Sequence, residues 1–211
     1  MIGYFVTGTD TGVGKTFVTA ALAREARALG VKVFAFKPVE TGCSEVAGEL
    51  RGDDQLVLAE AAGGWQTGRL LGLYQFRDPV APLVASREAG TPIDIAAICS
   101  TARHTPAALT LVEGAGGWRV PITETVDMGG LAQRLGLPVI LVARAGLGTI
   151  NHSLLTAEAI ARDGCSLAAI VLSCIPTDSL PFADSNVAEI KRHVGCPVMV
   201  HSQGHSLSML L

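Results

Sequence analysis

The feature that most restricts the fold of this chain is a glycine-rich segment, Gly-Thr-Asp-Thr-Gly-Val-Gly-Lys-Thr, at positions 8–16. It follows an apolar run typical of a strand (2–7) and precedes a helical pattern (15–29). A turn between a strand and a helix aims several backbone N–H groups at one point, and the helix N-terminus adds partial positive charge. The segment therefore predicts a polyphosphate site, with Lys15 reaching the outer phosphates and the Thr16 hydroxyl binding Mg²⁺.

This segment departs in one place from the usual phosphate-loop pattern, G-x-x-x-x-G-K-[ST]. The first glycine of that pattern would stand at position 9, which is Thr9 here. A glycine-rich turn that binds nothing is the alternative, but Gly-Lys-Thr between a strand and a helix favours nucleotide binding. The loop residues expected to contact the nucleotide are Asp10, Gly12, Val13, Gly14, Lys15 and Thr16.

The rest of the chain alternates short apolar runs with longer helical patterns, as in parallel βαβ units. The runs are apolar throughout, which is typical of strands covered by helices on both faces. We predict one doubly wound α/β domain of the P-loop NTPase type over 1–211, with a mostly parallel sheet flanked by helices. The expected strands span 31–36, 109–112, 139–142, 167–172 and, at an edge, 197–200, and the expected helices span 53–63, 94–103, 127–136, 151–163 and 184–194.

Composition narrows the class of protein. The net charge is −3 and no run of Lys/Arg is present, so nucleic acid is not expected as a partner. The first residues lack the pattern of a signal peptide, and no uninterrupted apolar stretch of about 18 residues predicts a membrane span. The five cysteines are scattered without C-x-x-C spacing, which favours reduced thiols in the cytoplasm.

A lysine and a threonine follow the second expected strand in the segment Lys37-Pro-Val-Glu-Thr41-Gly. This places Lys37 and Thr41 at the carboxyl edge of the sheet, where ligands bind in open α/β folds. A lysine is more often a solvated surface charge. Here it ends an apolar strand and precedes a proline, which favours a place in the site.

Two further segments offer carboxylates. Asp53 and Asp54 open a helical pattern, where one could cap the helix or complete a Mg²⁺ shell. Glu113 ends an apolar strand and precedes glycines, including Gly116. A carboxylate at the end of a buried strand is costly unless it is paired or binds a metal. We therefore expect Glu113 at the metal and nucleotide, with an ion pair to a lysine as the alternative.

A second junction between a strand, a glycine turn and a helix lies near 142–151. Its backbone N–H groups, at Gly148, Thr149, Ile150 and Asn151, suit an anion such as a substrate carboxylate. Asn151 is equally suited to a plain helix cap. The i, i+4 pair His201 and His205 is not expected to bind metal because no third ligand is evident, and residues 201–211 carry no clear pattern.

Together these motifs resemble the dethiobiotin synthetase family. The phosphate loop shares that family's displaced glycine, and Lys37-Pro-Val-Glu-Thr41-Gly, Val112-Glu113-Gly-Ala-Gly-Gly117 and Leu147-Gly148-Thr149-Ile150-Asn151-His152 match in order and spacing from about residue 2 to 175. The resemblance implies a homodimer that makes the ureido ring of dethiobiotin from 7,8-diaminopelargonate, CO₂ and ATP with Mg²⁺.

The resemblance also implies roles for individual residues. Lys15 and Lys37 would contact phosphate and the carbamate, and Thr11 would lie beside the reacting groups. Thr16, Asp54 and Glu113 would hold Mg²⁺, Thr41 would bind the substrate, and 148–151 would bind its carboxylate across the dimer interface. The chain departs at Ser173, where some members carry an asparagine that reads adenine.

Two other functions share parts of this pattern. A nucleotide-driven switch of the partition or septum-site type would carry a signature lysine at the position of Asp10. An amidoligase of the cobyrinate type would carry a further glutaminase domain, for which 211 residues leave no room. Both absences favour the synthetase.

Overall fold

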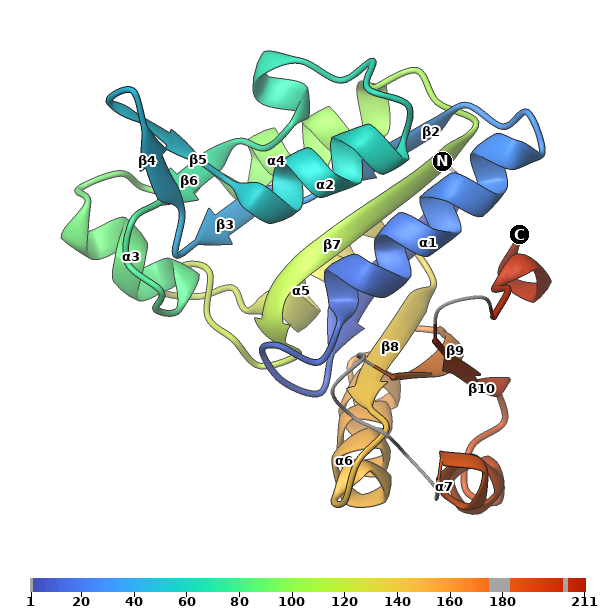
Figure 1. Ribbon diagram of the computed structural model, residues 1–211. Coiled ribbons are helices and arrows are strands. Elements are labelled where there is room, and N and C mark those ends of the chain that lie inside the picture. The colour runs from blue at the N-terminus through green and yellow to red at the C-terminus, as the bar shows by residue number, and fades with distance from the viewer. Residues whose placement is uncertain (1, 175–182, 203–204) are drawn as a thin grey trace.

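The computed structural model describes residues 2–174, 183–202 and 205–211. Its centre is a six-stranded sheet in the order β10-β9-β8-β1-β7-β2 (Figure 1). All neighbouring strands in this sheet pair in parallel, which confirms the predicted doubly wound α/β class. The strands are β1 (Gly3–Gly8), β2 (Val33–Phe36), β7 (Leu109–Gly117), β8 (Val139–Arg144), β9 (Leu167–Ser173) and β10 (Val198–His201).

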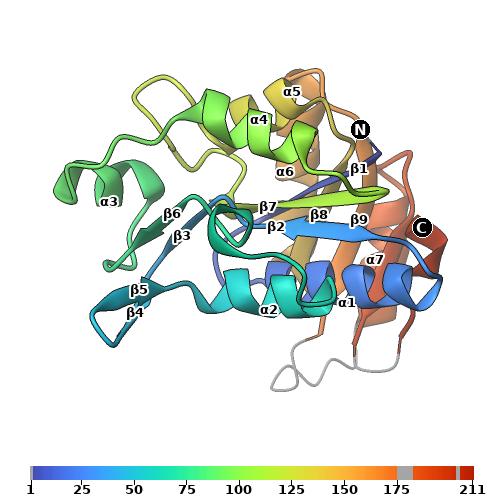
Figure 2. The same cartoon turned by 90° about the horizontal axis from the view of Figure 1, so that it is seen from above.

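Helices cover both faces of this sheet, as Figure 2 shows for α1 and α2 against α4 and α5. Successive strand residues point to opposite faces, so Phe5 and Val6 belong to different hydrophobic cores. The core under Val6 includes Val18 and Leu58, and the core under Phe5 includes residues of the other four helices. The helices are α1 (Lys15–Ala28), α2 (Asp53–Ala61), α4 (Ile95–His104), α5 (Met128–Leu135), α6 (Thr149–Arg162) and α7 (Ala183–Lys191).

The order of the strands reverses around β1. The chain leaves β1 for β2 at one edge, returns to β7 beside β1, and then crosses to β8 on the other side. In such folds ligands bind at the carboxyl ends of the strands where the order reverses. The phosphate loop follows β1, so the topology places it at that position.

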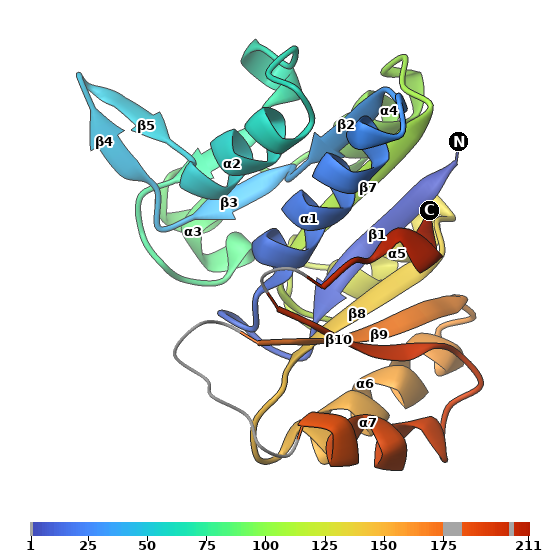
Figure 3. The same cartoon turned by 45° about the vertical axis from the view of Figure 1, so that its right-hand side comes forward.

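Several short elements were not predicted. β3 (Val39–Thr41) pairs in parallel with β6 (Tyr74–Phe76), and β4 (Ser44–Val46) and β5 (Glu49–Arg51) form a hairpin that projects from the body (Figure 3). Three residues are too few to display a period of two. α3 (Pro82–Glu88) is a seven-residue helix, shorter than the two turns needed for a clear helical pattern. Two 3₁₀ turns span Gly68–Leu70 and Ser208–Leu210.

The plain helix caps considered as alternatives for Asp53 and Asn151 are not the ones observed. The N-cap of α2 is Gly52, so Asp53 is already the first residue of the helix. The N-cap of α6 is Gly148, in a left-handed conformation with φ 89°, so Asn151 lies within the first turn. In both cases the glycine takes the capping position and offers no side-chain acceptor.

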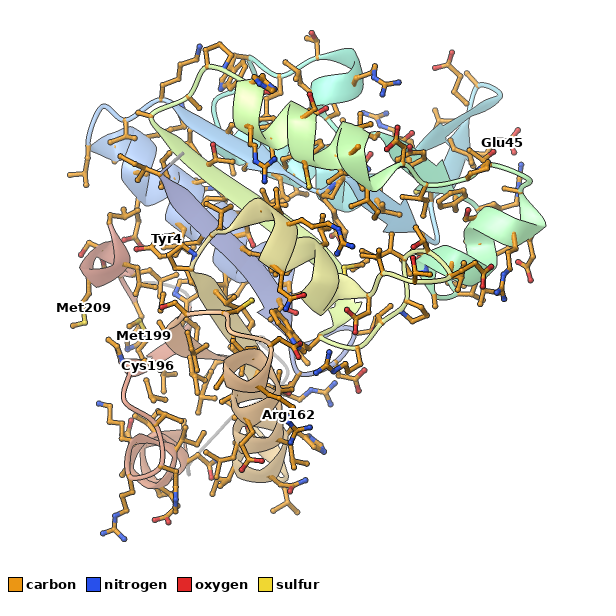
Figure 4. The ribbon with its side chains drawn as sticks, turned by 180° about the vertical axis from the view of Figure 1, so that it is seen from behind. Tyr4, Glu45, Arg162, Cys196, Met199 and Met209 are labelled. Carbon is orange, nitrogen blue, oxygen red and sulfur yellow. The ribbon has the colours of Figure 1, made fainter. Side chains whose placement is uncertain are left out.

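The end of the chain packs against α1 although its sequence shows no pattern. Leu207 and Leu210 are buried in the same core as Val18, and the Tyr4 hydroxyl donates to the Leu210 carbonyl oxygen at 2.7 Å. Figure 4 shows Tyr4 beside the turn that carries Met209. This tail therefore covers one face of the sheet.

The two histidines near the tail are hydrogen-bonded to each other rather than arranged on a helix. His201 Nδ1 donates to the His205 carbonyl oxygen at 2.9 Å, and the His201 ring contacts the Phe17 ring in a tilted arrangement with centroids 4.7 Å apart. Burial lowers the pKa of His201, and the bond to His205 opposes that effect. In the described parts of the chain, no helix has the length and apolar character needed to cross a membrane.

Candidate active site

A cavity of about 520 Å³ lies at the carboxyl edge of the sheet, within the size range of small-molecule sites. Three of the predicted segments meet there: the phosphate loop, the residues after β2, and the glycine-rich end of β7. The residues that line it are Thr11, Gly12, Gly14, Lys15, Thr16, Lys37, Thr41, Asp54, Pro79, Val80, Ala81, Pro82, Ala115, Gly116 and Val120.

The phosphate loop closes one side of this cavity. Gly12 (φ 70°) and Gly14 (φ 93°) adopt the left-handed backbone that favours glycine, and Gly14 is the N-cap of α1. Lys15 is buried, and its Nζ donates to the Asp10 carbonyl oxygen at 3.0 Å. The Val13 side chain packs into the core beneath α1, which leaves only its backbone for a ligand.

Lys37 and Glu113 form a buried pair beside the loop. Lys37 Nζ lies 3.2 Å from Glu113 Oε1 and also contacts Asp54 Oδ2. The Thr16 hydroxyl donates to Glu113 Oε1 at 2.8 Å. Glu113 is fully buried, and its Oε2 has no hydrogen-bond partner among the described residues. Glu113 therefore forms the ion pair with a lysine that was its alternative role, here with Lys37. It also contacts the phosphate loop through Thr16.

The two buried lysines have opposite pKa shifts. Burial lowers the pKa of Lys15 below its ordinary value; the Glu113 carboxylate opposes this and the Lys37 ammonium adds to it. Burial acts on Lys37 in the same direction, but the carboxylates of Glu113 and Asp54 outweigh it and raise the pKa of Lys37. Lys37 is therefore held firmly as a cation, while Lys15 is the lysine whose charge is poorly compensated.

The oxygen groups at this site fit Mg²⁺. Thr16 supplies a hydroxyl, Asp54 a half-exposed carboxylate and Glu113 a buried oxygen without a partner. Hard oxygen ligands of this kind, with phosphate and water, are what Mg²⁺ prefers. Of the two neighbouring aspartates, Asp54 lines the cavity, whereas the exposed Asp53 does not.

The surroundings of Glu113 differ from the prediction in one respect. The strand was expected to end at Val112, with Glu113 just beyond it, but β7 continues to Gly117. The glycines extend the pairing, since Gly117 lies opposite Gly8 after a shift in register. Glu113 is therefore fixed inside a strand, which makes its position more rigid than a loop would.

Several predicted site residues do not line this cavity, namely Asp10, Val13, Glu113, the segment 148–151 and Ser173. Gly148 and Asn151 are exposed at the start of α6, and Thr149 is buried. Ser173 is fully buried at the end of β9, opposite Arg144 and His201 on the neighbouring strands. Its hydroxyl has no hydrogen-bond partner within the described ranges. The structure thus leaves the predicted roles of these residues untested.

Two groups of site residues were missed from the sequence. The segment 79–82 forms one wall of the cavity, and its Pro-Val-Ala-Pro composition signals only a turn before a helix. Glu40 accepts hydrogen bonds from the backbone N–H groups of Asp54 and Gln55, both at 2.9 Å. Gln55 in turn donates to the Lys37 carbonyl oxygen at 3.1 Å. Glu40 stands within the recognised Lys37–Gly42 motif, but nothing local indicates its distant partners.

Comparison with known proteins identifies sequence relatives over nearly the whole chain. A family model described as an AAA domain matches residues 3–201. The ATP-dependent dethiobiotin synthetase BioD of Anaeromyxobacter dehalogenans (strain 2CP-C) is 46% identical over 194 residues, which cover 91% of this chain and 85% of the relative. The protein of the same name from Pseudomonas aeruginosa (strain UCBPP-PA14) is 40% identical over 203 residues, with 94% and 88% covered.

Solved structures with a similar fold have much lower sequence identity. The cell division protein FtsY of Thermotoga maritima aligns with a TM-score of 0.51 and 17% identity, covering 93% of this chain and 60% of that one. A nucleotide-binding protein from Archaeoglobus fulgidus, in complex with ADP, aligns with a TM-score of 0.50 and 13% identity, covering 99% and 84%. At these identities the likeness concerns the fold alone.

Proposed function

The chain belongs to the dethiobiotin synthetase family, and from that premise we propose that it closes the ureido ring of dethiobiotin from 7,8-diaminopelargonate, CO₂ and ATP, with Mg²⁺. Its relatives' names identify an ATP-dependent ligase of biotin biosynthesis. They favour this activity over a partition-type switch or a cobyrinate-type amidoligase. The observation that carries the proposal is that Lys15, Lys37 and Thr16 line one cavity, with the buried Glu113 carboxylate in contact with Lys37 and Thr16.

The reaction needs charge stabilisation rather than a protein nucleophile. One substrate amine attacks CO₂ to give a carbamate, and a carbamate oxygen attacks the γ-phosphorus to give a carbamic–phosphoric anhydride and ADP. The second amine attacks the carbamate carbon, and phosphate leaves as the ring closes. Phosphoryl transfer depends mostly on positioning and on cations where negative charge accumulates. Lys15 and Lys37 supply two such cations, from the segments that follow β1 and β2 on either side of β7.

The two lysines suit different parts of this chemistry. Lys37 is fixed between Glu113 and Asp54, so its charge is oriented before substrate arrives. Among the described residues, Lys15 donates only to a carbonyl oxygen of its own loop, and it is ready to transfer its donors to phosphate oxygens. Together they disfavour a further positive charge nearby, which lowers the pKa of a substrate amine. Only the neutral amine attacks CO₂.

Mg²⁺ fits the oxygens of Thr16, Asp54 and Glu113, and when bound it would neutralise charge on the phosphates of ATP. Thr41 lines the cavity and is proposed to hydrogen-bond the diamine. Thr11 lines it from the loop itself and is proposed to lie beside the reacting groups. The cytoplasm, where ATP is available and thiols stay reduced, is the proposed compartment.

A homodimer completes the proposed site. Gly148, Thr149, Ile150 and Asn151 do not line the cavity of their own chain, yet their backbone suits a carboxylate. Leu147 and Leu155 flank them as large exposed apolar residues, which supports contact with a second copy. We propose that this segment binds the substrate carboxylate in the partner's site. Each chain of the proposed dimer consists of one domain.

Product analysis tests this proposal. Purified protein is incubated with 7,8-diaminopelargonate, ¹³C-bicarbonate, ATP and Mg²⁺, and the products are separated by mass spectrometry. We expect dethiobiotin that carries the label at its ureido carbon, formed together with ADP. Consumption of ATP without labelled product would contradict the proposed reaction.

A further inference from the structure

Glu40 is a buried carboxylate beside the site, and the proposed reaction gives it no role. It lies in β3 and is only 6% exposed. Its Oε1 accepts from the Asp54 N–H and its Oε2 from the Gln55 N–H, both at 2.9 Å. A buried carboxylate is costly without such donors. Both donors come from the first turn of α2, which links Glu40 to that helix.

Glu40 occupies the position that a capping side chain would take in α2. The N-cap residue is Gly52, which makes no side-chain bond to the helix. A Cβ added at Gly52 would lie 2.6 Å from Glu40 Oε2, closer than real Cβ atoms approach. Glu40 therefore caps α2 from a separate strand, and its negative charge also suits the helix N-terminus.

This cap connects two parts of the phosphate site. Asp54 belongs to the capped turn, and its carboxylate contacts Lys37 Nζ. Gln55, the other capped residue, donates to the carbonyl oxygens of Lys37 and Tyr74 at 3.1 and 3.2 Å. The backbone of Asp54 is thus tied to the strand region that carries Lys37 and Thr41. A helix cap that only stabilises the fold would not require this connection.

We propose that Glu40 is a positioning residue for the Mg²⁺–nucleotide site, which holds the Asp54 carboxylate in place by fixing the backbone of the first turn of α2. The inference rests on the proposed role of Asp54 as a Mg²⁺ ligand. Glu40 does not touch the substrate or the metal. Its effect on nucleotide binding passes through Asp54, and this distinguishes it from a purely structural cap.

A double-mutant cycle on ligand binding tests this inference without the reaction. Calorimetry gives the Kd of a non-hydrolysable ATP analogue with and without saturating Mg²⁺, and the ratio of the two Kd values measures the benefit of the metal. The four proteins are the wild type, Glu40→Gln, Asp54→Asn and the double variant. We expect Glu40→Gln to reduce the ratio by about fivefold in the wild type and by less than about twofold beside Asp54→Asn, since coupled residues are not additive.

Two further variants distinguish the positioning effect of Glu40 from an effect of its charge and from an effect on folding. Gly52→Ala keeps the charge of Glu40 but displaces its carboxylate, so it should also reduce the ratio of the two Kd values. This variant replaces Glu40→Gln in the test if Glu40→Gln does not fold. Glu45→Gln removes the exposed carboxylate that pairs with Arg77 and should leave the ratio unchanged.

The possible outcomes distinguish a failure of the positioning role of Glu40 from a failure of the proposed reaction. A lower melting temperature for Glu40→Gln with an unchanged ratio, or an equal reduction in both backgrounds, would overturn the positioning role. An unchanged ratio for Asp54→Asn alone would remove Asp54 from the metal site, and with it the basis of this inference. A ratio that behaves as expected in a protein that makes no dethiobiotin would refute the proposed reaction and leave the positioning role intact.

Discussion

Two clusters of polar and charged side chains each include a residue in β7 or directly after it, and they are built in different ways. The phosphate cluster consists of Lys15, Lys37, Asp54 and Glu113. The surface cluster consists of Trp118, Arg119, Asp127 and Asp163. In the surface cluster, Asp163 accepts from Trp118 Nε1 at 2.7 Å and from Arg119 Nη2 at 2.9 Å, and Arg119 also contacts Asp127 at 3.2 Å.

The difference between the clusters lies in how completely their groups are satisfied. In the surface cluster, Arg119 is half-exposed and each named charge faces an opposite charge. In the phosphate cluster, two ammonium groups share a buried space, and Glu113 Oε2 lacks a partner among the described residues. Such costs are retained where a ligand later supplies the missing partner. We infer that the phosphate cluster serves activity and the surface cluster serves stability.

The largest expected effect is the loss of either buried lysine. Lys15→Ala and Lys37→Ala should each lower kcat/KM by about 10²-fold or more, the ~2.7 kcal/mol typical of one preorganised charge-stabilising donor. Lys37→Ala should also lower the melting temperature, because Glu113 loses its ion-pair partner, whereas Lys15→Ala should not. Steady-state kinetics and thermal melts check both. Near-normal turnover by Lys37→Ala would remove it from the mechanism.

A smaller effect is expected from neutralising Glu113 at constant size. Glu113→Gln retains an acceptor for the Thr16 hydroxyl, and Lys37 keeps Asp54 as its partner. Activity should fall by about tenfold or more, and the Mg²⁺ concentration that gives half the maximal rate should rise. Titration of Mg²⁺ in the assay measures this. An unchanged Mg²⁺ requirement with a lower melting temperature would make Glu113 a structural ion pair only.

The surface cluster should respond in the opposite way. Asp163→Asn should reduce the free energy of unfolding by about 1 kcal/mol, or roughly 2–4 °C in melting temperature, because the bonds to Asp163 lose their charge. Its kcat/KM should stay unchanged. A loss of activity without a loss of stability would reverse the assignment of the two clusters.

The pH dependence of this difference gives a second check. The hydrogen bond from Arg119 holds the pKa of Asp163 below its ordinary value, with burial opposing and Trp118 assisting. A group whose pKa is depressed by folding stabilises above its ordinary pKa and loses that contribution as the pH falls. The gap in melting temperature between the wild type and Asp163→Asn should therefore shrink below about pH 4. A gap that stays constant to about pH 2.5 would mean that the charge of Asp163 contributes nothing.

The smallest expected effect concerns the nucleotide base. An asparagine amide matches the donor and acceptor edge of adenine, and Ser173 has only one short hydroxyl. Ser173 is also fully buried and does not line the cavity, whereas Lys15, Lys37 and Asp54 do. We expect kcat/KM for GTP and CTP within about tenfold of ATP, or ~1.4 kcal/mol. Assays at saturating diamine compare the three. A preference for ATP above about a hundredfold would show that other groups read adenine.

The parts of the site that the sequence predicted are those with a local signal. The phosphate loop, Lys37 and Glu113 each follow an apolar strand, and parallel strands bring their carboxyl ends to one edge. Glu40 could not be predicted, because its partners lie 14 and 15 residues away and across a hairpin that shows no pattern. For the same reason the sequence left capping by Asp53 open as an alternative, whereas the acceptor comes from another strand.

In the fold, too, the elements with a local sequence signal were predicted and those without one were missed. Five strands of the central sheet and the six longer helices match their expected ranges to within three residues, and β7 runs five residues further than expected. The agreement is close because apolar periodicity reports burial directly. β3, β6 and α3 were missed because their length hides any period. In the tail at 205–211, Leu207 and Leu210 join the core beside α1, and Ser206 and Leu207 donate to Glu25 of that helix. Two apolar positions are too few to form a recognisable pattern.

The dependence of ATP turnover on both co-substrates tests the central claim most directly. Phosphate release is measured with purified protein, ATP and Mg²⁺, with and without 7,8-diaminopelargonate and bicarbonate. If the phosphate cluster serves ring closure, release should require the diamine and bicarbonate together and should be lost in Lys37→Ala. An equal rate of release without the diamine would show that the cluster drives ATP hydrolysis alone, and would contradict the account.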